Sequence, residues 1–143
     1  MPRSLRKFGP VFVLSAALAC GTSTPDIEQL NTAFDESARR FVEYRLPNSM
    51  ARPPGFDLEG HLRQVEAQRR VVSRVFHSPA GVEFVVSRIR EEPDELVTLA
   101  GLEILADSRL RSAIPTFEQF SNSPRSVVAE WARRYLAESA TWP

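Results

Sequence analysis

The spacing of apolar residues is the feature that most constrains this fold. From residue 25 onward, apolar side chains recur every three or four positions. No stretch shows the sustained alternation, rich in Val, Ile and Thr, that is typical of strands. The pattern therefore predicts an all-α fold with about six helices.

The first predicted helix runs from Pro25 to Tyr44, with Thr24 as its N-cap and Pro25 at its first position. Its apolar stripe consists of Ile27, Leu30, Phe34, Ala38 and Phe41. The segment 46–56 is predicted to be a loop, because its prolines lack N–H donors and restrict the residues before them.

A second helix is predicted from Asp57 to Phe76, with Asp57 as its cap. The residues expected to point inward are Leu62, Val65, Val72, Val75 and Phe76. Arg63, Arg70 and Arg74 share the opposite face, where interspersed acidic residues favour a solvated helix face over a lipid-phosphate site.

Proline marks the starts of the remaining helices. His77-Ser78-Pro79 precedes a short helix carrying Val82, Val85, Val86 and Ile89, and Pro93 is expected at the first position of the next helix. That helix is apolar nearly all round and should be buried on several sides. Another short helix carries Ile114, Phe117 and Phe120. Ser123-Pro124 is expected to start the last helix, whose predicted inward residues are Val127, Val128, Trp131, Ala132, Tyr135 and Leu136.

The second half of the chain matches itself at an offset of 31 residues. The matched pairs include Val86 with Phe117, Ile89 with Phe120, Pro93 with Pro124, Gly101 with Ala132 and Leu105 with Leu136. The repeated unit is a short helix, a turn with proline and a longer helix. Such units bury their core against one another.

This repeat resembles the HEAT-repeat family in its short bacterial form. The residues that carry the resemblance are Leu96 to Leu105, the predicted turn Ala106-Asp107-Ser108, Ala113-Ile114-Pro115 and Ser123 to Leu136, within a region of about 79–139. Residues 25–76 do not continue the period, so a short HEAT-like array and a compact helical bundle both remain open. The resemblance implies protein interaction, with Ser87, Arg90 and Glu118 exposed on a concave side.

The N-terminal segment 1–19 differs from the rest in charge and hydropathy. Arg3, Arg6 and Lys7 precede the uncharged apolar run 11–19, which is too short to span a bilayer. This arrangement predicts a secretory signal peptide. The chain has 18 basic and 18 acidic residues; without those three basic residues it has 15 against 18, a net charge of −3. A mildly acidic domain has no general attraction for nucleic acid.

Cys20 is the single cysteine and follows Ala17-Leu18-Ala19. The four residues resemble the lipobox of bacterial lipoproteins, which implies cleavage before Cys20 and acylation of its thiol. Ala17 departs from the more usual leucine, and ordinary A-x-A cleavage is the alternative. With residues 20–24 as a short tether, the chain is expected to be exported and lipid-anchored, facing the periplasm. Gly21 in place of aspartate favours the outer membrane.

Catalytic motifs are missing from the sequence. There is no metal-ligand spacing, phosphate loop or nucleophile elbow, so no enzyme activity, metal or cofactor is predicted. His61 is expected to be exposed, and His77 to meet a carbonyl at a helix end. The acidic group Glu91, Glu92, Asp94 and Glu95 is explained by a helix start. Trp131 fits the core, and Trp142 is expected at the membrane interface or frayed.

These observations predict a membrane-anchored adaptor or scaffold of the bacterial cell envelope that binds an unknown envelope protein. The alternative is an envelope enzyme or small-ligand carrier with a pocket under segment 46–56. A deep pocket with convergent polar groups would favour the carrier, and a flat polar groove would favour the adaptor.

Overall fold

The computed structural model describes residues 25–45 and 55–143. Those residues are all-helical and contain no strand, which confirms the predicted fold class. The predicted signal peptide, Cys20, the predicted tether, Thr24 and segment 46–54 lie outside the described residues. Gly55 and Phe56, which end the predicted loop, are non-helical. The helices are α2 (Ile27–Arg45), α3 (Leu58–Phe76), α4 (Pro79–Ile89), α5 (Glu95–Ser108), α6 (Ile114–Phe120) and α7 (Ser126–Ser139), with a short 3-10 helix, η2 (Arg111–Ala113), before α6.

Local capping explains where several helices begin. The side chain of Asp57 accepts a hydrogen bond from the Gly60 N–H at 2.9 Å, so α3 begins as predicted. Ser78 caps α4 in the same way, with Pro79 in the first turn. These two starts are encoded within three or four residues of sequence, which is why the sequence pattern located them.

Three predicted helix starts are wrong by two residues. Asp26, not a residue before Pro25, caps α2: its carboxylate accepts from the Gln29 N–H at 2.8 Å, and Gln29 accepts from the Asp26 N–H at 3.2 Å. Asp94 caps α5, so Pro93 precedes the helix. The last helix begins at Ser126, after Pro124 and Arg125. In the first two cases the aspartate that follows the proline is the cap, because its carboxylate accepts a hydrogen bond from a backbone N–H in the first turn of the helix.

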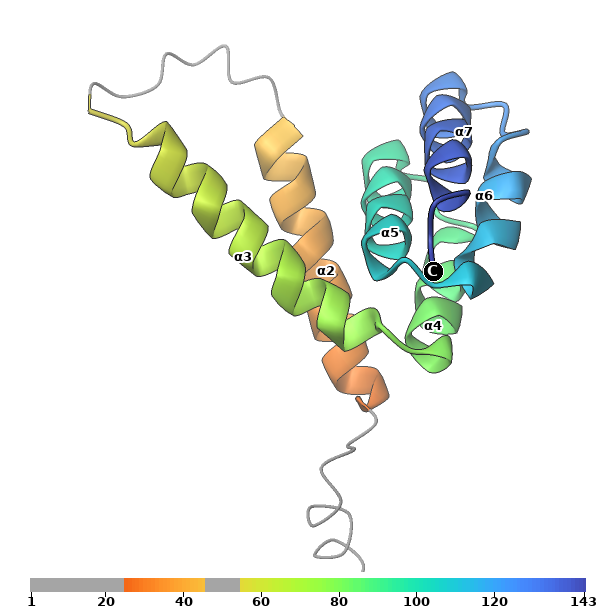
Figure 1. The fold of residues 1–143 in the computed structure, drawn as a ribbon, viewed down its shortest axis with the longest axis horizontal. Helices are drawn as coiled ribbons and strands as arrows, with labels where there is room; N and C mark the ends of the chain where they lie inside the picture. Colours follow the sequence, from red (N-terminus) through yellow and green to blue (C-terminus); the bar gives the residue numbers. More distant parts are fainter. Residues whose placement is uncertain (1–24, 46–54) are drawn as a thin grey trace, which may run out of the picture.

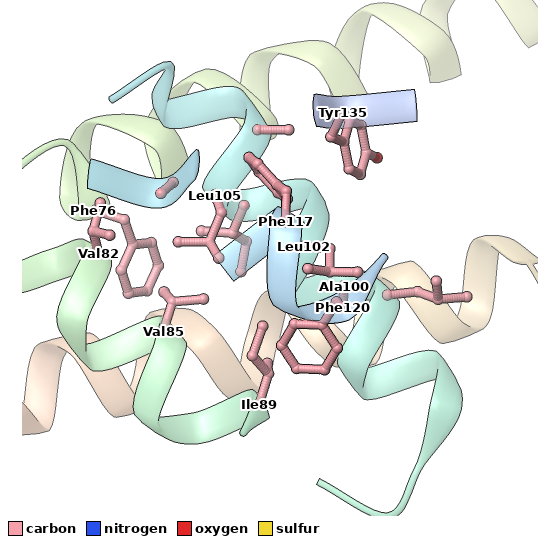
Figure 2. Packing of buried hydrophobic residues seen from close by; sticks show 14 of the residues in the cluster. Phe76, Val82, Val85, Ile89, Ala100, Leu102, Leu105, Phe117, Phe120 and Tyr135 are labelled. Carbon is pink, nitrogen blue, oxygen red and sulfur yellow. The ribbon is translucent and has the colours of Figure 1, made fainter. Parts of the chain in front are cut away.

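Helix α5 is the centre of the molecule. It contacts α2, α3, α4 and α7, while α6 packs on α7 (Figure 1). Its buried residues occur on every side, as its apolar sequence predicts. Figure 2 shows side chains such as Ile89, Leu102 and Phe117 converging between the helices around it.

The structure follows the 31-residue offset in the longer helices, whereas the shorter helices α4 and α6 differ in length, with 11 and 7 residues. The predicted turn Ala106-Asp107-Ser108 is wrong, because these residues are the last of α5. Helices α5 and α7 each have 14 residues, and both their first and their last residues are 31 positions apart. Ser108 and Ser139 end them with the same hydrogen bond, from the hydroxyl to the carbonyl three residues earlier. Each longer helix packs on the shorter helix before it, α5 on α4 and α7 on α6.

Several side chains differ in exposure from the sequence prediction. Leu62 and Val127, expected to point inward, are 45% and 40% exposed. Trp142, expected at the membrane interface or frayed, is buried, and its ring meets Phe117 edge to face at 5.9 Å between centroids. The C-terminus is therefore part of the core, and Arg111 reinforces it by donating to the carbonyls of Trp142 and Pro143.

Candidate functional site

A cleft of about 670 Å³ lies between α2, α3 and α5. In Figure 1, α2 and α3 cross near the C-terminal end of α3 and diverge toward the C-terminal end of α2. The apolar residues lining the cleft are Phe41, Leu62, Val65, Val72, Ala100 and Ile104. Its charged residues are Arg40, Glu66, Arg69, Arg70, Glu103, Asp107 and Arg109. The cleft thus combines apolar surface with charges of both signs.

The apolar side of the cleft comes partly from the N-terminal half of α3. Leu58, Leu62, Val65 and Val72 lie along one side of the helix. Of these, Leu62, Val65 and Val72 line the cleft, and Val72 also packs against the core. Leu58 and Leu62 are 41% and 45% exposed. Toward the other end of α3, Phe76 is buried against Phe84, and their ring centroids lie 6.3 Å apart. The stripe is therefore covered at one end of the helix and open at the other.

An ion cluster joins α3 to α5 across the cleft. Arg69 donates two hydrogen bonds to the Asp107 carboxylate, at 3.0 Å from Nε and 2.7 Å from a terminal nitrogen, and its Nε lies 3.6 Å from Glu103. The hydrogen bond to Asp107 raises the pKa of Arg69 above its ordinary value, more than burial lowers it. This bidentate pair fixes the spacing of α3 and α5 where the cleft narrows.

A second cavity, of about 430 Å³, adjoins the first between α5, α7 and the C-terminus. Arg69, Glu103, Asp107 and Arg109 line both cavities. Tyr135 lines the second cavity only. Its pKa is raised by burial and further by the carboxylates of Glu103 and Asp107. The residues of the ion cluster therefore lie between the two cavities.

Arg109 is the most unusual residue of the site. Its φ of 52° is in the left-handed region, and it is the sole non-glycine residue with a positive φ in the described part of the chain. Glycine or asparagine is the usual residue at such a helix C-terminus, because a Cβ is strained there. Arg109 is exposed, and its guanidinium makes no hydrogen bond or ion pair with any residue that the structure describes.

Of the residues singled out from sequence for chemistry or binding, Arg70 alone lines the cleft. His61 is half-buried, not exposed, and its ring lies 5.4 Å from that of Phe56. His77 Nδ1 donates to the Ser108 carbonyl at 2.8 Å, which is the predicted helix-end contact. Trp131 is half-buried, with its ring centroid 5.8 Å from that of Phe41. Ser87, Arg90 and Glu118 are exposed and lie outside both cavities.

Sequence reasoning missed the ion cluster, although a signal was present. Beyond its first turn, α5 carries two charged residues, Glu103 and Asp107, one turn apart on a helix that is otherwise apolar. Carboxylates at that spacing share one side of a helix. Two carboxylates on a helix that is predicted to be buried require a cationic partner. Arg69 is that partner.

Two searches of the described residues gave negative results. Within residues 25–45 and 55–143, no three His, Cys, Asp or Glu side chains are placed to hold a metal ion. None of the helices in those ranges has the length and apolar content needed to cross a membrane. In the comparisons with known proteins, no family model, no curated protein and no solved structure matches the chain.

Proposed function

We propose that this protein is a membrane-anchored bacterial lipoprotein whose helical domain acts as an adaptor or scaffold of the cell envelope. The observation that carries the proposal is the open cleft between α2, α3 and α5, with its exposed apolar stripe and charged residues of both signs. Exposed apolar surface bordered by polar residues is typical of protein-interaction sites.

The chemistry of the cleft supports a protein partner. Leu62 would lose much of its exposed apolar surface on binding, which stabilises a complex by about 25 cal/mol per Å² removed from water. The surrounding charges would set the orientation of the partner more than its affinity. No catalytic step is part of the proposal.

The anchor would keep the cleft near a membrane. If Cys20 is acylated, residues 20–26 extend over about 25 Å at most, and the 19 residues of α2 add about 28 Å. The open end of the cleft would then lie within about 53 Å of the attached lipid. The expected partner is accordingly an envelope protein close to the bilayer, with the outer membrane favoured by Gly21.

Crosslinking capture from native membranes tests the adaptor function. Four chains are compared: the intact protein, Cys20→Ala, Leu62→Gln in the cleft, and Val71→Gln as a matched control. Val71 is an exposed valine on the same helix, outside the cleft lining. We expect one stoichiometric envelope protein with the intact chain and with Val71→Gln, and a loss of capture with the other two. Capture that Leu62→Gln leaves unchanged would exclude the cleft as the binding surface.

The intact mass of the exported chain tests the anchor separately. Acylation at Cys20 adds the mass of the lipid to a chain that begins at that residue, and Cys20→Ala should abolish this addition. A chain that begins at an unmodified Cys20 would support A-x-A cleavage and a secreted protein instead.

The volume of the cleft favours a second candidate function, as a carrier of a small ligand. At about 670 Å³ it falls within the range of about 300–1,000 Å³ that is common for ligand sites. Native mass spectrometry of the purified chain distinguishes the two. A bound small molecule that Leu62→Gln removes and Val71→Gln retains, without a captured protein, would favour the carrier.

A further inference from the structure

The second cavity, between α5, α7 and the C-terminus, is lined by a buried tyrosine whose hydroxyl the fold leaves unpaired. Tyr135 is 8% exposed, and its ring packs on Phe117 and Trp131. Its hydroxyl makes no hydrogen bond with any residue that the structure describes. Among those residues, every side-chain oxygen or nitrogen that is sealed from solvent has a partner, so this hydroxyl is reachable from the cavity. A polar group that the fold leaves unpaired needs a partner from solvent or from a ligand.

The Tyr135 hydroxyl can act as a hydrogen-bond donor. Burial raises the pKa of Tyr135, and the carboxylates of Glu103 and Asp107 raise it further. The hydroxyl therefore stays protonated throughout the physiological pH range. A protonated hydroxyl donates its hydrogen to an acceptor such as a carboxylate or phosphate oxygen.

Two arginines that line the same cavity also have unused donors. Arg109 makes no hydrogen bond or ion pair with any described residue. Arg134 makes one long hydrogen bond, from its Nε to Glu138 at 3.4 Å, and its terminal nitrogens bond to none of the described residues. The positive charge of Arg134 opposes the rise in the pKa of Tyr135, which places these two groups near each other. Because a guanidinium has five N–H donors, most of the donors at this cavity have no acceptor in the described fold.

The carboxylates of the cavity, in contrast, have arginine partners. Arg69 binds both oxygens of Asp107, and its Nε lies 3.6 Å from Glu103. Glu138 is paired with Arg134. Three arginines and three carboxylates line the cavity, so its formal charges balance while its hydrogen-bonding groups do not. The ligand that supplies the missing acceptors is an oxyanion.

We propose that the second cavity binds a small oxyanion, a phosphate or carboxylate group that accepts hydrogen bonds from the guanidinium groups of Arg109 and Arg134 and from the hydroxyl of Tyr135. The volume of about 430 Å³ is that of a small-molecule site, and the predominance of charged side chains in the lining favours a charged ligand over an apolar one. The proposal is independent of the adaptor function and assigns no occupant to the cleft.

Isothermal titration calorimetry of the full chain in detergent tests this site. The probes are inorganic phosphate, succinate and succinamide, which is the uncharged analogue of succinate, all at the same ionic strength. The proteins are the wild type, Arg109→Gln, Tyr135→Phe and Arg133→Gln. Arg133 is an exposed arginine on α7 that lines neither cavity and has no ion pair with a described residue, so it controls for the loss of one positive charge.

We expect phosphate or succinate to bind the wild type and Arg133→Gln with the same Kd, and succinamide not to bind. The anion with the lower Kd shows which oxyanion the site prefers. Arg109→Gln and Tyr135→Phe should each weaken Kd about tenfold, as expected for the loss of one hydrogen bond to a charged group. At neutral pH, Tyr135→Phe should keep the stability of the wild type in urea denaturation, because the phenylalanine ring preserves the packing and the hydroxyl makes no bond in the described fold.

The inference is overturned if neither anion binds, if succinamide binds as tightly as succinate, or if Arg109→Gln and Tyr135→Phe bind the anion as tightly as the wild type does. An equal loss of binding with Arg133→Gln would indicate a general attraction between charges and would also overturn it. A clear loss of stability in Tyr135→Phe at neutral pH would assign the hydroxyl to the fold and not to a ligand. Capture of a partner from native membranes is a separate measurement, so the adaptor function can fail while this site is retained, and the reverse.

Discussion

Substituting Gly101 by alanine should destabilise the protein, although alanine is the better helix former. Gly101 is buried in α5, and a Cβ at this position would lie 2.2 Å from Cγ2 of Ile89 on α4. Carbon atoms in contact normally lie about 3.5–4.0 Å apart, so the two helices or the isoleucine must shift by more than about 1 Å. Ile89 is fully buried and branched at Cβ, so its methyl group has little freedom to move.

The expected magnitude follows from two opposing contributions. Alanine in place of glycine stabilises a helix by about 1 kcal/mol. Overpacking a well-packed core costs about 1–3 kcal/mol, and the depth of this overlap favours the upper end. We therefore expect Gly101→Ala to lower the free energy of unfolding by about 2 kcal/mol.

Urea denaturation followed by circular dichroism measures this change, as a lower midpoint at an unchanged slope. Ile89→Leu removes the branch at Cβ and is the matching rescue variant: in its background, Gly101→Ala should cost less than about 1 kcal/mol. An increase in stability for Gly101→Ala alone would refute the reasoning, because it would mean that α4 and α5 separate without cost.

Three further predictions concern the cleft and its ion cluster. Arg109→Gly should be more stable than Arg109→Ala by about 1 kcal/mol in the same denaturation assay. Glycine removes the left-handed strain, and both variants lose the same guanidinium. Equal stabilities of the two variants would mean that the backbone at this position is unstrained. A double-mutant cycle of Arg69→Gln and Asp107→Asn should give a coupling energy of about 1 kcal/mol, because the pair is bidentate but half-exposed. A coupling energy near zero would mean that the pair does not hold α3 to α5. The raised pKa of Tyr135 means that the folded chain keeps a proton that the unfolded chain loses near its ordinary pKa of 10.0. The contribution of Tyr135 to the free energy of unfolding should therefore be constant below that pH and be lost progressively above it. Tyr135→Phe should flatten this fall, and an unchanged alkaline limb would contradict the assignment.

The sequence located the helices well where the deciding interactions are local. Asp57 and Ser78 each cap a helix through a backbone N–H three residues away. The errors at Pro93 and Pro124 have a local cause as well: proline was assigned to the first turn, whereas Asp94 caps α5 and α7 begins after Arg125. The relation between α5 and α7 was also visible in the sequence. The 31-residue offset relates two helices of equal length and places Ala132 where the first helix has Gly101.

The candidate site was not predicted, because its residues come from distant parts of the chain. Arg69 and Asp107 are 38 positions apart, and neither has a neighbour in sequence that indicates the other. The apolar pattern of α3 predicted an inward face for Leu62, but it cannot distinguish a stripe that is covered from one that is left open. Trp142 was similarly misplaced, since its contact with Phe117 depends on how the C-terminus folds back.

The sequence by itself determined the all-helical class, the helix positions and the buried character of α5. These follow from interactions within about one turn and from the period of apolar residues. The tertiary structure decided that α2 and α3 diverge, that Arg69 joins α3 to the acidic side of α5, and that Arg109 lies strained at the junction of two cavities. Helix periodicity specifies which face of a helix is apolar, whereas the relative placement of the helices specifies how much of that face remains open to a partner.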